Sequence, residues 1–165
     1  MIAEPVAPFV ARDLRFRPVA AGWELAAYHR LRRRAFCDEQ RLFDGDDRDA
    51  IDDLAVALVA VARVAGVVDD VVGGVRIWEA AAGAWWGGRL VTQPEHRGVA
   101  GVATGLIRLA VATARRRGAR SFRATVQVAN APLFDRLGWT RLEAIAVRGA
   151  PHLVMAAELG GGAAS

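Results

Sequence analysis

Residues 85–117 read WWGGRLVTQPEHRGVAGVATGLIRLAVATARRR, and this stretch decides the fold. Residues 85–91 have the bulk and β-branching that are typical of a strand interior. A loop containing a proline follows, and after it the apolar residues recur at helical spacing. Gly118 stands where a left-handed C-cap is expected. The stretch therefore predicts a strand, a loop and a helix in that order.

The loop between this strand and this helix has the composition of an anion-binding site. Small residues keep side chains out of the way at four of its positions, namely Gly98, Ala100, Gly101 and Ala103. The first N–H groups of a helix lack intrahelical partners and carry the positive end of the helix dipole, and Arg97 adds a charge beside them. We therefore expect a phosphorylated cofactor. The GxxxxGK[ST] loop does not fit because the chain has no lysine, and GxGxxG fails at Ala100 and Ala103.

The same residues resemble the acyl-CoA-binding loop of the GNAT N-acetyltransferase superfamily, which reads [QR]xxGx[GA]. The matching window is residues 98–103, and the leading basic residue falls one position early, at Arg97. A second stretch, residues 121–139, resembles the next strand and short helix of that family, where a typical member reads NxxAxxLYxxLGF. The positions that match it are Asn130, Leu133, Phe134, Leu137, Gly138 and Trp139.

The resemblance implies an α/β (α+β) fold, with a mixed, mostly antiparallel central sheet, helices on both faces and a central strand-loop-helix acyl-CoA site. We expect one domain over residues 1–159 and a disordered tail over residues 160–165. Parallel pairing is expected between the strands at 85–91 and 122–128, because a crossover helix joins them. The remaining strands are expected near residues 14–19, 55–64, 67–78, 140–148 and 152–158, with the last hairpin turned at Gly149-Ala150-Pro151. Helices are expected at 22–36, with a continuation through residue 43, and at 130–137.

The resemblance also implies direct transfer of an acetyl (acyl) group from acetyl-CoA to the amine of a small amine or amino-acid-like molecule. The backbone of residues 97–104 would hold the pyrophosphate, and the end of the preceding strand would pair with the pantetheine arm and polarise the thioester carbonyl. The cofactor-binding residues implied are Leu90, Val91, Thr92, Arg97, Gly98, Val99, Ala100, Gly101, Val102, Ala103, Thr104, Asn130, Leu133 and Phe134.

An alkylammonium acceptor is neutral in only about one molecule in ~10³ at pH 7, so it needs a base. The candidate bases are Glu39, Glu79, His96 and His152. Glu39 and His152 rank first, because the first helix and the last strand usually line the acceptor pocket of this family. Phe134 occupies the position where many relatives have a tyrosine that protonates the leaving thiolate. A non-catalytic acyl-CoA-binding or sensing module is therefore an alternative.

Residues 44–53 contain six aspartates. The spacing of a calcium-binding EF-hand fails at Arg48 and no glutamate closes the loop, so no metal site is expected. Two roles of this loop remain open, a solvent-exposed turn and a wall of the acceptor site. As a wall, the loop would attract a cationic acceptor. Arg76 and Arg89 could bind a substrate carboxylate or a neighbouring aspartate. Tyr28, Arg32, Phe36 and this loop also resemble the acyl-homoserine-lactone synthases, which share the fold and give a further alternative.

The composition of the chain limits the kinds of partner that we expect. The net charge is +4, and all 22 basic residues are arginine, so a small excess of positive charge produces the high isoelectric point. We expect no nucleic-acid partner. The apolar run at residues 55–62 ends at Arg63, far short of the ~20 residues of a membrane span, and Cys37 is the only cysteine. A cytoplasmic, bacterial protein without a membrane partner is expected, and a homodimer is compatible with the sequence.

Overall fold

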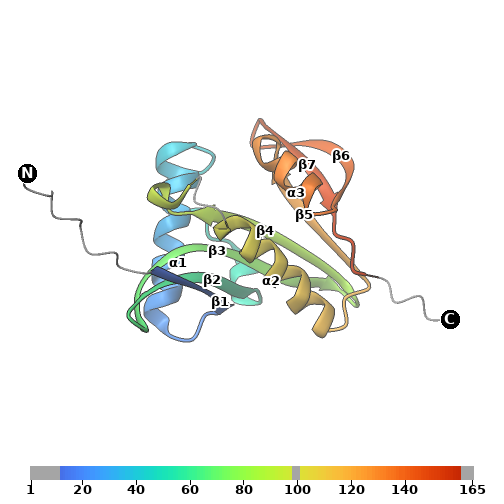
Figure 1. The fold of residues 1–165 in the computed structure, drawn as a ribbon. Coiled ribbons are helices and arrows are strands. Elements are labelled where there is room, and N and C mark those ends of the chain that lie inside the picture. Colours follow the sequence, from blue (N-terminus) through green and yellow to red (C-terminus); the bar gives the residue numbers. More distant parts are fainter. Residues whose placement is uncertain (1–11, 98–100, 161–165) are drawn as a thin grey trace, which may run out of the picture.

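The computed structural model describes residues 12–97 and 101–160. Seven strands form one sheet in the order β1-β2-β3-β4-β5-β7-β6 (Figure 1). The strands are β1 (Arg12–Pro18), β2 (Val56–Val64), β3 (Val67–Ala81), β4 (Ala84–Thr92), β5 (Ser121–Gln127), β6 (Thr140–Val147) and β7 (Ala150–Ala156). The β4–β5 pair is parallel and every other neighbouring pair is antiparallel. The predicted fold class is confirmed.

Helices cover both faces of this sheet (Figure 1). The helical segments are α1 (Gly22–Arg32), η1 (Arg33–Glu39), η2 (Ala50–Asp53), η3 (Pro94–His96), α2 (Val102–Arg116), η4 (Val128–Asn130) and α3 (Ala131–Arg136). The π-helical η1 continues α1 without a break, as the sequence predicts for this region. One core cluster lies between α1 and the sheet, and the other lies between the sheet and α2 with α3.

The sequence patterns account for these two cores. In β2, five consecutive residues from Leu58 to Ala62 are buried, because the strand is covered on both faces and cannot alternate with polar residues. The buried residues of α2 recur at helical spacing on one stripe. Gly118 has φ of 87° and ends α2 as expected.

The last hairpin differs from its prediction. Val147 pairs with Ala150, so the turn consists of Arg148 and Gly149, with φ of 49° and 81°. Two positive φ angles define a type I′ turn, which matches the twist of the flanking strands. The predicted turn at Gly149-Ala150-Pro151 is therefore wrong, because Pro151 already lies in β7 opposite Ala146. Residues 161–165 of the predicted tail over residues 160–165 lie outside the described residues, as do residues 1–11 of the predicted domain.

Glu24 ties β1 to the start of α1. Its buried carboxylate accepts hydrogen bonds from Arg17 of β1 and from the backbone N–H groups of Ala20 and Ala21. The hydrogen bond from Arg17 is the main cause that lowers the pKa of Glu24 to about 2, and the two backbone N–H groups lower it further. Because folding depresses this pKa below its ordinary value, the carboxylate stabilises the fold above about pH 4.5 and loses that effect as the pH falls towards 2.

We predict that Glu24→Gln flattens the acid limb of the stability profile. The free energy of unfolding of the original chain should fall between pH 5 and pH 2 by more than that of the variant, because the variant has no carboxylate to protonate. Urea titrations at several pH values measure both curves. Asp135→Asn is the matched control, since Asp135 pairs with Arg141 at the exposed surface and should change the profile little. Parallel curves for the original chain and Glu24→Gln would contradict the prediction.

Candidate functional site

The site begins where β4 and β5 separate. The two strands pair over only four residues each, Ala84–Gly87 with Ser121–Ala124. Beyond that point β5 continues beside β7 and turns away from β4 (Figure 1). The remaining residues of β4 therefore face a gap on the side away from β3. A gap at the end of a parallel pair exposes strand N–H and C=O groups to a ligand.

A β-bulge lies in the unpaired half of β4. Gly74 of β3 pairs with Val91 and Arg76 pairs with Gly88, so Arg89 and Leu90 together oppose the single residue Val75. Arg89 has φ of 54°, an unusual value for a residue other than glycine. The hydroxyl of Tyr28 in α1 donates a hydrogen bond to the carbonyl oxygen of Arg89 over 2.8 Å. The bulge is thus held from the α1 face of the sheet.

A cavity of about 300 Å³ occupies the gap. Its wall on the α1 face comes from η1, the following loop, β3 and the bulge, with Phe36, Phe43, Asp49, Arg76, Trp78 and Arg89. Its wall on the α2 face consists of Ile107, Ala110, Phe122, Ala124, Phe134 and Trp139. Thr125, Gln127, Asn130 and His152 lie along the diverging strand β5, the η4 turn and β7. The cavity therefore joins the two faces of the sheet through the split.

The structure brings four of the predicted site residues to this cavity, namely Leu90, Asn130, Phe134 and His152. Val91 and Thr92 continue β4, Leu133 packs against the core, and Val102, Ala103 and Thr104 form the first turn of α2. Gly101 is the N-cap of α2 with φ of 107°, a conformation that favours glycine. Gly98, Val99 and Ala100 lie outside the described residues.

Two residues predicted for separate roles contact each other. A guanidinium nitrogen of Arg97 lies 2.9 Å from a carboxylate oxygen of Glu39, and Arg34 lies 3.8 Å from the other oxygen. Glu39 ends η1 and does not line the cavity. Nor do Glu79, which accepts a hydrogen bond from the N–H of Gly83, and His96 of η3.

His152 is the candidate base that lines the cavity. It is buried on β7, opposite Gln127 of β5. Its Nδ1 lies 2.9 Å from the carbonyl oxygen of Ala150, which can only accept a hydrogen bond. That contact assigns the proton to Nδ1 and leaves the lone pair on Nε2. The imidazole can thus accept a proton through Nε2.

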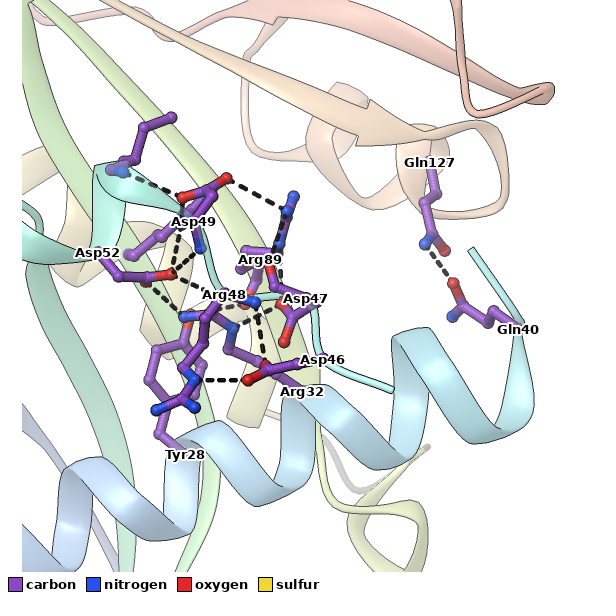
Figure 2. Close-up of polar contacts among 12 residues, drawn as sticks. Tyr28, Arg32, Gln40, Asp46, Asp47, Arg48, Asp49, Asp52, Arg89 and Gln127 are labelled. Carbon is purple, nitrogen blue, oxygen red and sulfur yellow. Dashed lines mark hydrogen bonds and ion pairs between the residues drawn. The ribbon is translucent and has the colours of Figure 1, made fainter. Parts of the chain in front are cut away.

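The acidic loop forms a buried ion-pair network with three arginines (Figure 2). Arg32 of α1 is fully buried and lies 2.8 Å from Asp47 and 2.7 Å from Asp52. Further pairs join Arg76 of β3 to Asp49 at 2.7 Å and to Asp52 at 2.9 Å, and join Arg89 to Asp47 at 2.9 Å. The network links α1, the loop, β3 and β4, which are far apart in the sequence.

These pairs change the electrostatic interpretation of the loop. Burial raises the pKa of Asp52, but the hydrogen bonds from Arg32 and the Asp49 N–H and the nearby positive charges outweigh it, so the pKa is lowered. The hydrogen bond from Arg76 likewise lowers the pKa of Asp49. Asp47, Asp49 and Asp52 are paired with arginines, so these three of the six aspartates of the loop do not present free negative charge to a cationic acceptor. Within the described residues no three His, Cys, Asp or Glu side chains are grouped as metal ligands.

The α1 side of the cavity has groups that favour an anion. The guanidinium carbons of Arg89 and Arg148 lie 4.5 Å from the centre of the Phe43 ring. Arg148 projects from the β6–β7 turn, and no carboxylate of the described residues lies within 4.0 Å of it. The Nε of buried Arg76 has no hydrogen-bond partner there either. The sequence offered no signal for Phe43, Trp78 or Arg148, because their roles depend on contacts between distant elements.

Two further residues that the sequence analysis names, Cys37 and Phe134, are buried. Cys37 is buried outside the cavity lining, and burial is the main cause that raises the pKa of its thiol, so it is poorly suited as a nucleophile. Phe134 packs edge-on against Trp139, with ring centres 5.0 Å apart. The aromatic ring at this position thus belongs to the core beside the cavity.

Comparisons with known proteins agree with this architecture. The Acetyltransferase (GNAT) family model matches residues 23–139. A protein of Lactobacillus plantarum assigned as an N-acetyltransferase has a TM-score of 0.74 at 23% identity, over 90% of this chain and 99% of that one. FeeM, an N-acyl amino acid synthase from uncultured soil microbes, has a TM-score of 0.67 at 14% identity, over 91% of this chain and 92% of its own.

The AHL synthase LasI has a TM-score of 0.65 at 14% identity, over 92% of this chain and 91% of its own. No curated protein matches the chain in sequence. Because the family match spans most of the chain, the protein belongs to the GNAT family of acetyltransferases, enzymes that use acyl-CoA. In the described ranges, no helix has both the length and the apolar character needed to cross a membrane.

We predict that Arg32→Met destabilises the fold by about 3–5 kcal/mol, because it leaves Asp47 and Asp52 buried without their main cation. Urea unfolding followed by circular dichroism measures the change. Arg48→Met is the matched control, since Arg48 pairs with Asp46 at the surface, and it should cost less than about 1 kcal/mol. Equal effects of the two substitutions would show that the buried network does not hold the loop.

Proposed function

We propose that the protein transfers an acyl group from an acyl-CoA, acetyl-CoA in the simplest case, directly to the amine of a small amino-acid-like acceptor. The observation that supports this best is the convergence of His152, Arg76 and Arg89 on one cavity at the split between β4 and β5. The cavity offers the donor an unpaired strand edge and offers the acceptor a base and cations.

The donor would lie in the split. The N–H and C=O groups of residues 88–92 that β3 and Tyr28 leave unpaired can hydrogen-bond a pantetheine arm as a further strand would. The start of α2 follows from the same end of β4, so its free N–H groups can receive the pyrophosphate. Arg97 would then exchange its contact with Glu39 for a phosphate, or hold both.

The acceptor would enter from the α1 face. An ammonium must lose a proton before its nitrogen can attack, and only about one alkylamine in ~10³ is neutral at pH 7. Nε2 of His152 can take that proton while Nδ1 stays bound to Ala150. A base held in this way is the usual means of general base catalysis and contributes about 10²–10⁴-fold.

Charge favours an acceptor that also carries a carboxylate. The three network arginines are balanced by three aspartates, which leaves Arg148 as an additional positive charge beside Phe43. A simple cationic amine would be repelled by that charge, whereas a zwitterion can place its carboxylate there. The free Nε of Arg76 is a second donor on the same side. The related fold of FeeM, an N-acyl amino acid synthase, is compatible with such an acceptor.

We predict that the enzyme prefers amino acids over the amines they yield on decarboxylation. Matched pairs, such as leucine with isoamylamine and phenylalanine with phenethylamine, are compared by the kcat/KM for thiol release from acetyl-CoA. Arg148→Gln should lower kcat/KM for the amino acids about tenfold or more and leave the amines nearly unchanged, because one charge-assisted contact is worth about 1.5–3 kcal/mol. Arg30→Gln, at an exposed site on α1, is the control.

A preference for the amines, or equal effects of Arg148→Gln on both members of a pair, would contradict a carboxylate-bearing acceptor. If no acceptor of the panel gives thiol release but calorimetry shows acetyl-CoA binding, the result would instead favour the acyl-CoA-binding module. Absence of acetyl-CoA binding as well would refute the proposed function.

We predict that His152→Gln lowers kcat by about 10²–10⁴-fold, because the variant lacks the proton acceptor. The acidic limb of the kcat/KM profile against pH should disappear in the variant, a change that a structural role of His152 would not produce. Calorimetric affinity for acetyl-CoA should stay within about twofold, since the imidazole acts on the acceptor. An unchanged acidic limb in a folded variant would assign the base to another residue.

A further inference from the structure

The α2 wall of the cavity is apolar throughout. Its six side chains come from α2, β5, α3 and the residue that precedes β6, namely Ile107, Ala110, Phe122, Ala124, Phe134 and Trp139. The rings of Phe122 and Trp139 lie 5.4 Å apart, and that of Phe134 packs against Trp139. Of these six side chains only that of Trp139 has a hydrogen-bonding group, its indole N–H. Such a wall binds hydrocarbon better than it binds water.

Small residues give this wall its depth. Ala110 and Ala124 are buried and line the cavity from opposite sides of it, one on α2 and the other on β5. Gly87 marks the closed end, because it is the last residue of β4 that pairs with β5. A Cβ atom at Gly87 would lie 3.1 Å from the Cζ atom of Phe122, so the Phe122 ring rests against the strand and closes the cavity there.

The position of the donor directs its acyl group to this wall. In the proposed function the thioester lies along β4 and the acceptor approaches from the α1 face, where the cations and His152 are. A thioester carbon is attacked from one face, so the substituent of its carbonyl must leave room for the acceptor. The α2 side of the cavity, with Ala110 and Ala124 in its lining, offers that room.

The size of the cavity exceeds what an acetyl group requires. An apolar cavity of roughly 150 Å³ is enough to bind benzene, a ligand of six carbon atoms. The cavity here is about 300 Å³, a volume that the thioester and the acceptor share with the acyl group. A single methyl group would leave most of the aromatic wall without a contact, which is unfavourable for a buried apolar surface.

We propose, on the basis of the function proposed above, that the preferred donor carries a medium acyl chain of about four to eight carbons, bound against the α2 wall of the cavity. Ala110 and Ala124 are then the residues that determine acyl-chain length. Each methylene that enters the wall should tighten binding about fourfold until the wall is filled.

The test compares acetyl-, butanoyl-, hexanoyl-, octanoyl- and dodecanoyl-CoA by calorimetry, with no acceptor present, so the readout does not depend on activity. We expect affinity to rise by at least tenfold from acetyl-CoA to hexanoyl- or octanoyl-CoA and to fall again for dodecanoyl-CoA. All titrations stay below the concentration at which dodecanoyl-CoA, the longest donor, forms micelles. A titration of dodecanoyl-CoA in the presence of detergent controls for non-specific adsorption.

Ala124→Leu and Ala110→Leu fill the wall from its two sides. Each substitution should lower the affinity for hexanoyl-CoA by tenfold or more, which removes most of its gain over acetyl-CoA. The affinity for acetyl-CoA should change less than about threefold. Ala112→Leu makes the same exchange on α2 outside the lining of this cavity, and it should leave the chain-length profile unchanged. Thermal unfolding identifies a variant that does not fold, and the second alanine then decides the test.

Equal affinity for all chain lengths, or a profile that neither filled variant alters, would overturn this inference and leave the proposed acyl transfer intact. If no acyl-CoA of any length binds, the proposed function itself fails. The two failures are therefore distinguishable from one set of titrations.

Discussion

The short parallel pairing of β4 with β5 is the constraint on which the site depends. Four residue pairs join the two halves of the sheet, and beyond Gly87 and Ala124 each strand follows a different neighbour. A strand that loses its partner in the middle of a sheet must find other hydrogen-bonding groups or water. The sheet therefore contains a permanent gap with an unpaired strand edge at its centre. The apolar wall of that gap belongs to the core cluster between the sheet and α2, whereas the other wall adds charged residues of the ion-pair network to aromatic side chains.

The ion-pair network maintains the charged wall. Removing charges from water is costly, so three arginines and three aspartates at the α1 face do not by themselves indicate a more stable fold. Their effect is geometric, because Asp47, Asp49 and Asp52 fix the loop after η1 against β3 and β4. That loop brings Phe43 under Arg89, and the β6–β7 turn adds Arg148 on the same ring. At the other end of the opening, Gln127 of β5 donates a hydrogen bond to Gln40 over 2.6 Å (Figure 2). Both halves of the sheet thus contribute to the acceptor side.

Most elements of the fold could be predicted from local patterns, because strand, helix and cap preferences are encoded within a few residues. The helix from residue 22 and the crossover to β5 follow from periodicity and from the rule for connections between parallel strands. The network could not be predicted in the same way, since Arg76 and Asp49 are 27 positions apart and Arg89 and Asp47 are 42 apart. The sequence signal for the network was the presence of two arginines within otherwise apolar strands. That signal left open whether they bind a substrate carboxylate or a neighbouring aspartate. The β6–β7 turn was misplaced because glycine and proline are both turn residues, and only the pairing register shows that Pro151 belongs to the strand.

Phe134 bears on whether the fold needs an acid for the leaving group. The ring packs edge-on against Trp139 and is almost fully buried, so its position serves the core of the α2 wall. A thiol has an ordinary pKa of about 8.5, far below that of an alcohol or an amine, and its anion is therefore a tolerable leaving group near neutral pH. Proton donation matters most when the leaving group is strongly basic, so its absence here costs less than it would in ester or amide cleavage. In the proposed reaction the step that needs help is deprotonation of the acceptor, and His152 is the proposed base because it lines the cavity and its Nδ1 is bound to the carbonyl oxygen of Ala150. The loss of a hydroxyl at position 134 is thus compatible with acyl transfer, and it enlarges the apolar surface that a donor chain can contact.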